Sequence, residues 1–374
     1  MAVLGRRDEP IDAVEEYCQY LGKALAAEGI SLELSRVRWI ETGWRKALRE
    51  LRERTMETGN PEWFLLQYTA LAWSRRGFSL RVMRVIRALK RSGARCAVVF
   101  HDAEPYYGSR LVDRIRRAVQ IHTMRQALRL ADLAVLTIPP DVIPWVPRGA
   151  QNGVFIPVGA NLPAPETAWK QAKEHRNDPP TVAIFSLSED GVRGEEVKLI
   201  AEALSFATKQ IGKLQAVVLG RNADIGGKEL AERLAGTFVK VTMYGLLPAE
   251  QIVRVLGSCD VLLFARGPLS TRRGSAMAAI SCGLPVVAQE GWETAAPITE
   301  AGVVLVARET KEGFGPALLR VLSDESYRAL LTERSKQAHQ RYFSWSVIAA
   351  QYARALRESE LDRRTQTRVA TKTR

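Results

Sequence analysis

Apolar residues along this chain follow two alternating patterns, short uninterrupted runs and longer segments with helical spacing. Runs such as WFLLQY (63–68) and ARCAVVF (94–100) predict buried strands. The segment 11–28 carries apolar residues at helical spacing, and Gly29 follows it as a helix-ending residue. Because strand and helix alternate in this way throughout, we expect mostly parallel sheets with helices on both faces.

The same pattern divides the chain into two α/β sets. The first set has predicted strands at 31–37, 63–68, 94–100 and 132–137 and predicted helices at 11–28, 43–55, 80–92 and 110–130. The second has predicted strands at 181–185, 214–219, 239–244, 261–264 and 286–288 and predicted helices at 193–209, 229–234 and 248–256, then a helix-rich stretch over 312–356. Prolines among charged residues between them indicate a linker. We therefore expect domains over 1–163 and 181–342 with a linker at 164–180, a terminal helix at 343–356, and a basic disordered tail at 357–374.

Composition is consistent with this two-domain interpretation and narrows the setting. The chain has 374 residues, enough for two domains, and 46% of them are hydrophobic. Neither a transmembrane run nor a signal peptide is evident, and the four cysteines are dispersed without a CxxC pair. We expect a cytoplasmic protein with reduced core thiols and no zinc site.

The net charge of +13 calls for a hypothesis about partners. About +8 of it lies in the first half, where arginines dominate the helices over 75–117. Two interpretations stay open, solvated helix faces or attraction to an anionic surface. No nucleic-acid motif is present, so we expect an anionic membrane surface rather than nucleic acid as the partner.

The segment 259–288, CDVLLFARGPLSTRRGSAMAAISCGLPVVA, carries the most specific chemistry. A strand is followed by a polar loop, and Arg272, Arg273, Gly274 and Ser275 then open a helix of small residues. The free N–H groups and the dipole of a helix N-terminus attract anions, and arginines bind phosphate bidentately. The pattern predicts an anion site at this helix start.

Ligands of open parallel sheets bind at the carboxyl ends of the strands. In the second half these ends carry 186–194, 220–221, 245–246, 266–275 and 289–294. Arg193 precedes Gly194 at a helix start, which again suits a phosphate, whereas Arg221 is as easily a solvated side chain.

Polar residues also follow strands in the first half. His101 and Asp102 come directly after a buried strand, where an imidazole could hydrogen-bond a sugar or accept a proton. Asp12 is either a site residue or a helix N-cap. The loop after 63–68 is expected to expose Trp73, which either shapes a ligand or membrane contact or packs against the other domain.

Together these features resemble retaining GT-B glycosyltransferases of the family 4 type. The resemblance is strongest over 182–306, and PIDAVEEYCQYLGKALAAEGISLEL, FHD (100–102), FIPVGANLP and FSWSVIAAQYARAL extend it to nearly the whole chain. It implies an α/β fold of two Rossmann-like domains with mostly parallel sheets facing across a cleft. It also implies that the terminal helix returns to the first domain.

The resemblance further implies a nucleotide-diphosphate sugar as donor and a sugar, glycan or lipid-linked acceptor. Arg193 would bind the diphosphate, as would Arg272 and Arg273 with the amides of Gly274 and Ser275. Ser188 stands where the family has an arginine, Leu246 would lie near the nucleotide base, and His101 near the transferred sugar. No metal and no cofactor beyond the donor substrate are expected, because arginines and helix dipoles stabilise the leaving diphosphate.

The chain departs from the family pattern at several site positions. Ser270 and Ala278 replace two glutamates eight residues apart, and Asp12-Ala13 replaces the glycine pair of the first loop. Two other classes therefore stay open. One is a non-catalytic glycosyltransferase-like binding protein, and the other is a different nucleotide-sugar enzyme of the same fold, such as an epimerase or a phosphorylase.

Overall fold

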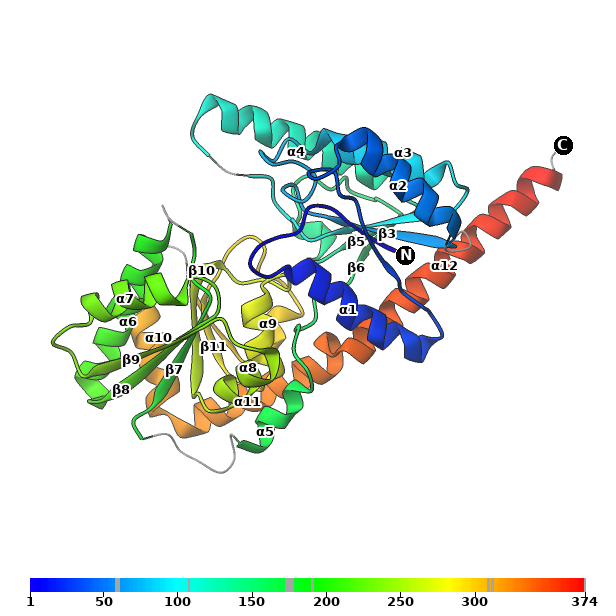
Figure 1. The fold of residues 1–374 in the computed structure, drawn as a ribbon. Coiled ribbons are helices and arrows are strands. Elements are labelled where there is room, and N and C mark those ends of the chain that lie inside the picture. The colour runs from blue at the N-terminus through cyan, green and yellow to red at the C-terminus, as the bar shows by residue number, and fades with distance from the viewer. Residues whose placement is uncertain are drawn as a thin grey trace. The chain divides into compact units, whose positions relative to one another are not determined.

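The computed structural model divides into two compact units, Met1–Pro157 with Trp345–Arg374, and Val158–Ser344 (Figure 1). The structure describes residues 1–57, 61–106, 108–171, 178–189, 192–307, 310 and 313–372, with side chains at 170–171 and 361–372 excepted. Positions 172–177 of the expected linker, 190–191 of the expected site loop, 312 of the helix-rich stretch and 373–374 of the tail lie outside this range. The domain limits expected from the sequence stay predictions.

The described part of the first unit contains a six-stranded, all-parallel sheet with the order β2-β1-β3-β4-β5-β6. Its strands are β1 (Ala2–Leu4), β2 (Leu34–Arg36), β3 (Trp63–Tyr68), β4 (Arg95–Phe100), β5 (Leu133–Leu136) and β6 (Gly153–Phe155). The central strands are buried almost throughout, which explains why they read as uninterrupted apolar runs.

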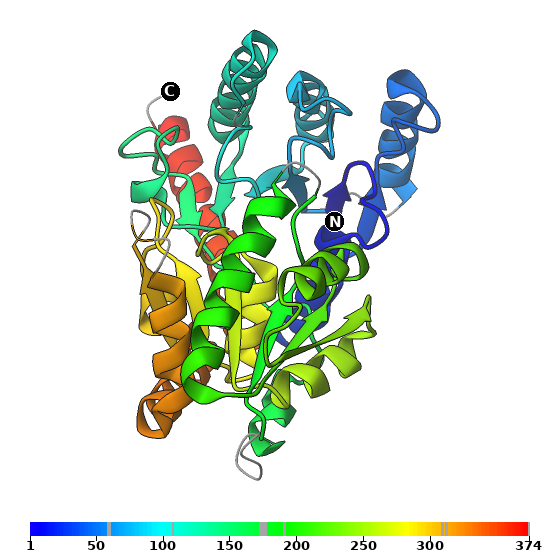
Figure 2. The same ribbon diagram turned by 90° about the vertical axis from the view of Figure 1, so that its left-hand side faces the viewer.

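Helices cover both faces of this sheet. They are α1 (Ala13–Leu25), α2 (Trp44–Glu57), α3 (Val82–Lys90), α4 (Leu111–Leu130) and α12 (Trp345–Lys372), with 3-10 turns η1 (Ala26–Glu28), η2 (Ser79–Arg81) and η3 (Pro140–Val142). Helices α2, α3 and α4 lie side by side on one face (Figure 2). Helices α1 and α12 pack together on the other face (Figure 1).

The described part of the second unit repeats this architecture, with the strand order β12-β11-β10-β7-β8-β9. Its strands are β7 (Thr181–Phe185), β8 (Leu214–Leu219), β9 (Val239–Gly245), β10 (Val261–Pro268), β11 (Val286–Gln289) and β12 (Val303–Val306). Its helices are α5 (Ala168–Gln171), α6 (Arg193–Ile211), α7 (Ala223–Arg233), α8 (Ala249–Gly257), α9 (Gly274–Ser281), α10 (Phe314–Ser323) and α11 (Glu325–Ala338), with η4 (Pro165–Thr167), η5 (Ile298–Glu300) and the π-helix η7 (His339–Phe343). Separate apolar clusters fill its two faces.

The predicted strands and helices are confirmed to within a few residues at most positions, with three informative differences. Strands β1, β6 and β12 were not among the predicted strands, and three residues, as in β1 and β6, are too few for a periodic signal. Helix α7 begins at Ala223 rather than near 229. Strand β10 continues to Pro268 through an irregularity in its pairing with β11.

Both sheets contain a point where the strand order reverses direction. In the first unit this point lies between β1 and β3, and in the second between β7 and β10. Loops on either side of such a point diverge to opposite faces and leave a crevice at the carboxyl edge. The fold therefore selects the loops after β1, β3, β7 and β10 as ligand-binding positions.

A buried hydrogen bond joins α1 to α12. The hydroxyls of Tyr17 and Tyr352 lie 2.8 Å apart, and both side chains are almost fully buried. Trp345 also stacks on Tyr20, with ring centroids 5.7 Å apart. Residues more than 300 positions apart thus complete one core.

We expect Tyr352→Phe to lower the free energy of unfolding by about 1–2 kcal/mol, because the Tyr17 hydroxyl then stays buried without its partner. Tyr17→Phe should have a similar effect. The double variant should be less destabilised than the sum, since neither unpaired hydroxyl remains. Urea unfolding of the four proteins checks this, and strictly additive losses would contradict it.

Candidate functional site

The loop after β10 brings the predicted anion-binding residues to the crevice of the second sheet. The register of β10 against β11 shifts between Phe264 and Pro268, as in a β-bulge, and Gly267 within it has φ +78°. Arg273 is the N-cap of α9, and Gly274 and Ser275 form its first turn. The N–H groups of that turn therefore stand at the carboxyl edge beside β7.

A buried glutamate holds the two arginines of this loop. Glu293, in the loop after β11, is 2% exposed. Its carboxylate accepts hydrogen bonds from Arg272 Nε at 2.7 Å and Nη2 at 3.2 Å, and from Arg273 Nη2 at 2.7 Å. It also accepts a hydrogen bond from the Ser270 hydroxyl at 3.1 Å. One carboxylate thus fixes three side chains of the neighbouring loop.

The cluster keeps an excess of positive charge. Burial lowers the pKa of the Arg273 guanidinium, the nearby Arg272 and Arg266 lower it further, and Glu293 raises it. Two arginines pair with one carboxylate and Arg266 adds further positive charge nearby, so the site stays cationic and suits an anion with more than one charge. Gly274 leaves room for such a ligand, because among the described residues no atom outside the helix start itself lies within 4 Å of a Cβ built there.

The loop after β7 borders the same crevice. Arg193 is the first residue of α6, and its Nε lies 3.6 Å from Glu229 Oε2 of α7. Its side chain also lies against Gly226, where an added Cβ would come within 3.2 Å of Arg193 Cδ. Among the described residues, a Cβ at Gly194 would have only the end of Glu229 near it, at 3.8 Å. Within the part of the chain that the structure describes, space is therefore left beside Gly194, as it is beside Gly274.

The remaining predicted residues of this unit differ in their availability. Ser188 is 9% exposed, and its N–H donates to the buried Glu196 carboxylate at 2.8 Å, so that amide is occupied within the protein. Leu246 follows β9 and is 47% exposed, but β9 is the edge strand, two places from β7. Arg221 follows β8, where its N–H donates to the Ser186 hydroxyl at 3.3 Å.

The crevice of the first sheet is a cavity of about 260 Å³. It is lined from the loops after β1, β2, β3 and β4 by Leu4, Gly5, Arg6, Asp8, Asp12, Ala13, Val14, Arg36, Gln67, Thr69, Leu71, Ala72 and Asp102. A Cβ at Gly5 would collide with the carbonyl oxygen of Ala72, so the first and third loops touch there. The cavity therefore lies at the strand-order reversal, as the topology requires.

His101 lies behind this cavity rather than in its lining. Its Nε2 is 2.8 Å from Oε1 of Gln67, and Gln67 does line the cavity. The edge of the ring packs against Tyr17, with centroids 5.1 Å apart. Burial lowers the pKa of His101 to about 4, and the charge of Asp12 acts in the opposite direction. The imidazole is therefore neutral near pH 7, with Nε2 as donor and Nδ1 as acceptor.

The structure bears on two expectations that concern the first unit. Asp12 is the N-cap of α1, since its Oδ1 accepts from the N–H groups of Val14 and Glu15, and its Oδ2 accepts from Arg36 Nη2 at 2.9 Å, while the residue also lines the cavity. The expectation that Trp73 is exposed is wrong. Its side chain is 1% exposed and its Nε1 donates to the carbonyl of Gln67 at 2.9 Å, because the loop folds back on its own sheet.

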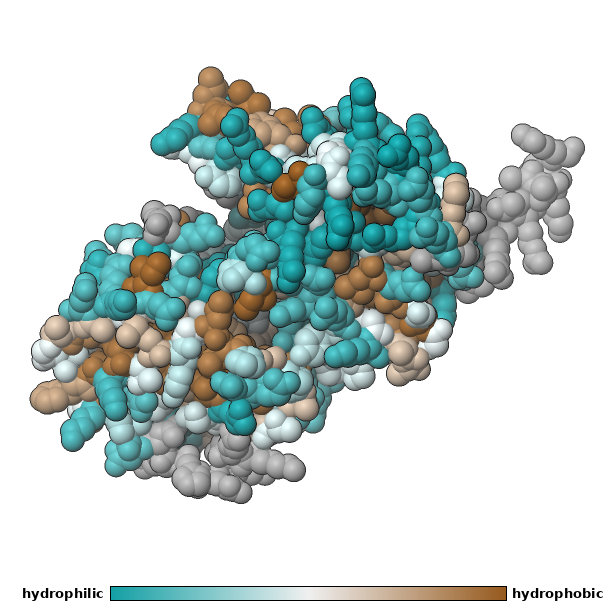
Figure 3. All heavy atoms as spheres, viewed as in Figure 1, coloured by the Kyte–Doolittle hydropathy of each residue, from teal (hydrophilic) through white to brown (hydrophobic). Residues whose placement is uncertain are grey.

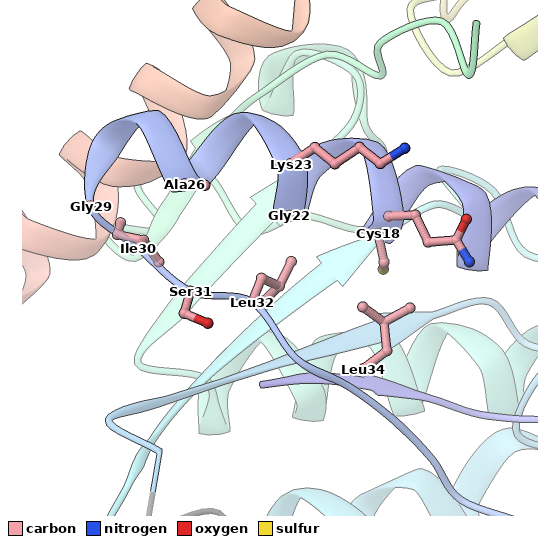
Figure 4. Close-up of a pocket in the computed structure, with 10 residues that line it drawn as sticks. Cys18, Gly22, Lys23, Ala26, Gly29, Ile30, Ser31, Leu32 and Leu34 are labelled. Carbon is pink, nitrogen blue, oxygen red and sulfur yellow. The ribbon is translucent and has the colours of Figure 1, made fainter. Parts of the chain in front are cut away.

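A further hollow lies beside α1, away from the carboxyl edge. Figure 4 shows Cys18 and Leu32 pointing into it from α1 and from the segment before β2, while Lys23 points away. Because its lining is mainly apolar and belongs to the end of α1 and the approach to β2, the topology gives it no ligand-binding role.

Comparison with solved structures identifies proteins of the same architecture. No family model and no curated protein matches the sequence. Sucrose-phosphate synthase from Thermosynechococcus elongatus superposes with a TM-score of 0.67 at 18% identity, covering 96% of this chain and 98% of that one. HepE from Anabaena, in complex with UDP-glucose, gives 0.62 at 14% identity over 96% and 99%. WaaG, a glycosyltransferase involved in lipopolysaccharide biosynthesis, gives 0.61 at 16% identity over 94% and 98%.

The chain has the GT-B fold. Two all-parallel sheets with flanking helices agree with these structures over nearly the whole of both chains. Among the residues that the structure describes, no group of three or more His, Cys, Asp or Glu side chains could hold a metal ion. None of the described helices is both long and apolar enough to cross a bilayer.

Glu293 is the site residue that sequence reasoning missed. The segment 289–294 was recognised as a strand end, but no local pattern connects Glu293 with Ser270, 23 positions earlier. The sequence does contain one indication of this role, since Glu293 follows the strand that is next along the chain after the loop bearing Arg272 and Arg273. Only the pairing of β10 with β11 turns that signal into a contact.

We expect Glu293→Gln to lower the free energy of unfolding by about 3 kcal/mol, because two partly buried guanidinium groups lose their counter-charge. Glu290→Gln is the matched control, since Glu290 is exposed in the same loop and should change stability by less than about 0.5 kcal/mol. Urea unfolding measures both. Equal effects of the two substitutions would show that the Glu293 contacts contribute nothing.

His101 makes stability depend on pH. Its pKa is about 4 in the folded chain and near the ordinary 6.5 when unfolded, so below pH 6.5 the unfolded state binds the proton more strongly. We expect stability present at pH 7 to be lost on acidification, by about 2 kcal/mol at pH 5. In His101→Gln this part of the pH dependence should disappear. Urea titrations at both pH values test it, and parallel losses in the two proteins would refute it.

Proposed function

We propose that the chain is a glycosyltransferase that moves a sugar from a nucleotide-diphosphate donor to an acceptor hydroxyl. The observation that carries this proposal is the cluster of Arg272, Arg273 and Glu293 at the start of α9. It places fixed positive charge and open backbone amides at the crevice where parallel sheets bind ligands. The similarity of fold to HepE with bound UDP-glucose supports a nucleotide-sugar donor.

In the proposed reaction the second unit binds the donor. Arg193, Arg273 and the amides of Gly274 and Ser275 neutralise the diphosphate as negative charge develops on it. Arg272 contributes to the same field, while Ser188 and Leu246 border the nucleotide. No metal and no further cofactor is assigned a role, since guanidinium groups and helix N-termini supply the positive charge.

The first unit would help to bind the transferred sugar and the acceptor. The bond between the anomeric carbon and the diphosphate oxygen breaks, and a bond from the acceptor oxygen forms with retention. The acceptor proton passes to the departing phosphate, because a histidine with a pKa near 4 is a weak base at neutral pH. His101 orients the site through Gln67, whose side chain reaches the cavity.

The setting of the reaction follows from charge. The excess of arginine in the first unit favours an anionic surface, so we propose a cytoplasmic enzyme, peripheral at the inner face of the membrane. A sugar, glycan or lipid-linked acceptor in glycan, polysaccharide or glycolipid assembly fits that location. The relation of WaaG to lipopolysaccharide biosynthesis is in keeping with it.

A binding protein without turnover is the second candidate. Ser270 and Ala278 are buried, at 0% and 4% exposure, and carry no carboxylate for a ribose hydroxyl. The Glu293 carboxylate beside Ser270 is itself engaged by arginines. Donor binding without sugar transfer or donor hydrolysis would favour this candidate over an enzyme.

The proposal is tested by calorimetry with UDP-, GDP- and ADP-sugars on the native chain and on Gly274→Ala. Among the described residues, the methyl group meets no atom within 4 Å outside its own helix start, so folding should be unchanged. It would project where a phosphate approaches the amides, and we expect binding at least about tenfold weaker.

Gly153→Ala in β6 is the matched control, because its Cβ meets only ordinary contacts at 3.6 Å or more. Thermal unfolding of both variants verifies folding. Absence of binding by all three classes of sugar nucleotide, or equal affinity of native and Gly274→Ala protein, would refute the proposed donor site.

A further inference from the structure

An open groove in the first unit carries a concentration of positive charge that the donor site does not use. Its volume is about 600 Å³, and it is lined by Trp39, Ile40, Thr42, Gly43, Trp44, Arg45, Lys46, Arg75, Arg81 and Arg84. We call this set the basic groove. Five of its side chains are cationic and no carboxylate lines it, so the groove would attract a multiply charged anion.

The arginines of the basic groove are not neutralised by the protein. Lys46 lies 3.9 Å from Glu50, one turn further along α2. Within the described residues, no ion pair is made by Arg45, Arg75, Arg81 or Arg84. Arg116 of α4, by contrast, pairs with Asp113 of its own helix at 2.9 Å. The groove therefore keeps its charge for an external partner.

The local backbone adds to this field. Helix α2 begins at Trp44, and its first turn contains no acidic residue but carries Arg45 and Lys46. Cations at the N-terminus of α2 interact unfavourably with the helix dipole and slightly destabilise the free helix. An anion bound there would neutralise the cations and would interact favourably with the dipole. The charge and the dipole thus favour the same class of ligand.

Two tryptophans form the wall of the groove. The rings of Trp39 and Trp44 stack with centroids 5.1 Å apart, and Trp39 Nε1 donates to the carbonyl of Ala72 at 2.9 Å. Arg81 lies over Trp44 at 5.7 Å from the ring centroid. This packing positions a guanidinium at the mouth of the groove.

Exposed apolar side chains on the same helical layer indicate what the anion is attached to. Leu80, next to Arg81, is 48% exposed, and Leu111, Val112 and Ile115 at the start of α4 are 71%, 45% and 52% exposed. Figure 3 shows apolar side chains gathered at that end of α4. A free phosphate would leave this apolar surface in water, whereas a lipid bilayer would cover it.

The apolar end of α4 is tied to the segment that carries the arginines. Gln120 of α4 donates to the carbonyl of Gly77 at 2.9 Å, and Arg116 lies over the ring of Phe78 at 5.7 Å. Helices α2, α3 and α4 lie side by side on one face of the sheet and all begin at its carboxyl edge (Figure 2). The basic groove and the apolar start of α4 therefore lie on the same face of the first unit.

We propose that the basic groove binds the phosphate-bearing headgroup of an anionic membrane lipid, with the apolar start of α4 entering the acyl boundary. This deepens the membrane partner of the proposed function by naming the residues that bind it. Lipid binding itself requires neither the donor nor sugar transfer, so the two can be tested separately.

The test is co-sedimentation of the full chain with phosphatidylcholine vesicles, with and without phosphatidylglycerol. We expect binding only to the anionic vesicles. The variant Arg75→Gln/Arg81→Gln/Arg84→Gln should lower the partition coefficient about a hundredfold, since each basic residue at a membrane surface contributes roughly a factor of five to ten.

The matched control is Arg52→Gln/Arg87→Gln/Arg91→Gln. These arginines are exposed on and just after α2 and α3, outside the groove, and their removal changes the net charge equally. We expect less than about a threefold loss in the control, because only screened long-range attraction is reduced. Equal losses in the two triple variants, or no loss in the groove variant, would overturn the proposal.

A second arm distinguishes a lipid from a soluble phosphate ester. Leu111→Ser/Ile115→Ser should weaken vesicle binding, while glycerol phosphate should not displace the native chain. Displacement by glycerol phosphate, or unchanged vesicle binding by the serine variant, would overturn the assignment to a lipid. Vesicle binding without donor binding would support the lipid site and refute the proposed donor site. Donor binding without vesicle binding would support the donor site and refute the lipid site.

Discussion

The second unit depends on one buried carboxylate at the edge of its sheet. Glu293 receives hydrogen bonds from Arg272, Arg273 and Ser270, and it reaches them because β10 and β11 are adjacent and parallel. Two arginines next to each other at a helix start would otherwise repel and stay mobile. The carboxylate fixes their geometry while leaving the cluster positively charged, which suits an anion with more than one charge and requires little reorganisation.

The same sheet topology explains where the rest of the chemistry lies. Each sheet reverses its strand order once, between β1 and β3 and between β7 and β10, and each reversal opens a crevice between diverging loops. The first crevice is a cavity with Gln67 and Asp102 in its lining, backed by a neutral His101. The second is bordered by the starts of α6 and α9. The same reversal of strand order therefore produces a polar crevice in the first unit and a cationic crevice in the second.

Arginines in this protein serve different physical purposes according to their partners. Arg36 pairs with the N-cap Asp12, and Arg272 and Arg273 pair with Glu293, so their positions are fixed within the fold. Arg75, Arg81 and Arg84 line an open groove whose lining contains no carboxylate. The net charge of +13 thus separates into a part that builds sites and a part directed outward. Composition alone cannot make that separation, because it does not record which charges are paired.

The GT-B architecture was expected from the resemblance to a known family. The apolar pattern of the sequence predicts the alternation of strands and helices and the position of the loops that bear Arg193, Arg273 and His101, because apolar periodicity and glycines at helix ends are local properties. It missed β1, whose three residues form a central strand only because β2 and β3 pair on either side of it. It also misjudged Trp73 and overlooked Glu293. These features emerge only in the folded chain, because burial and ion pairing depend on which loops the sheet brings together, and no local pattern encodes that.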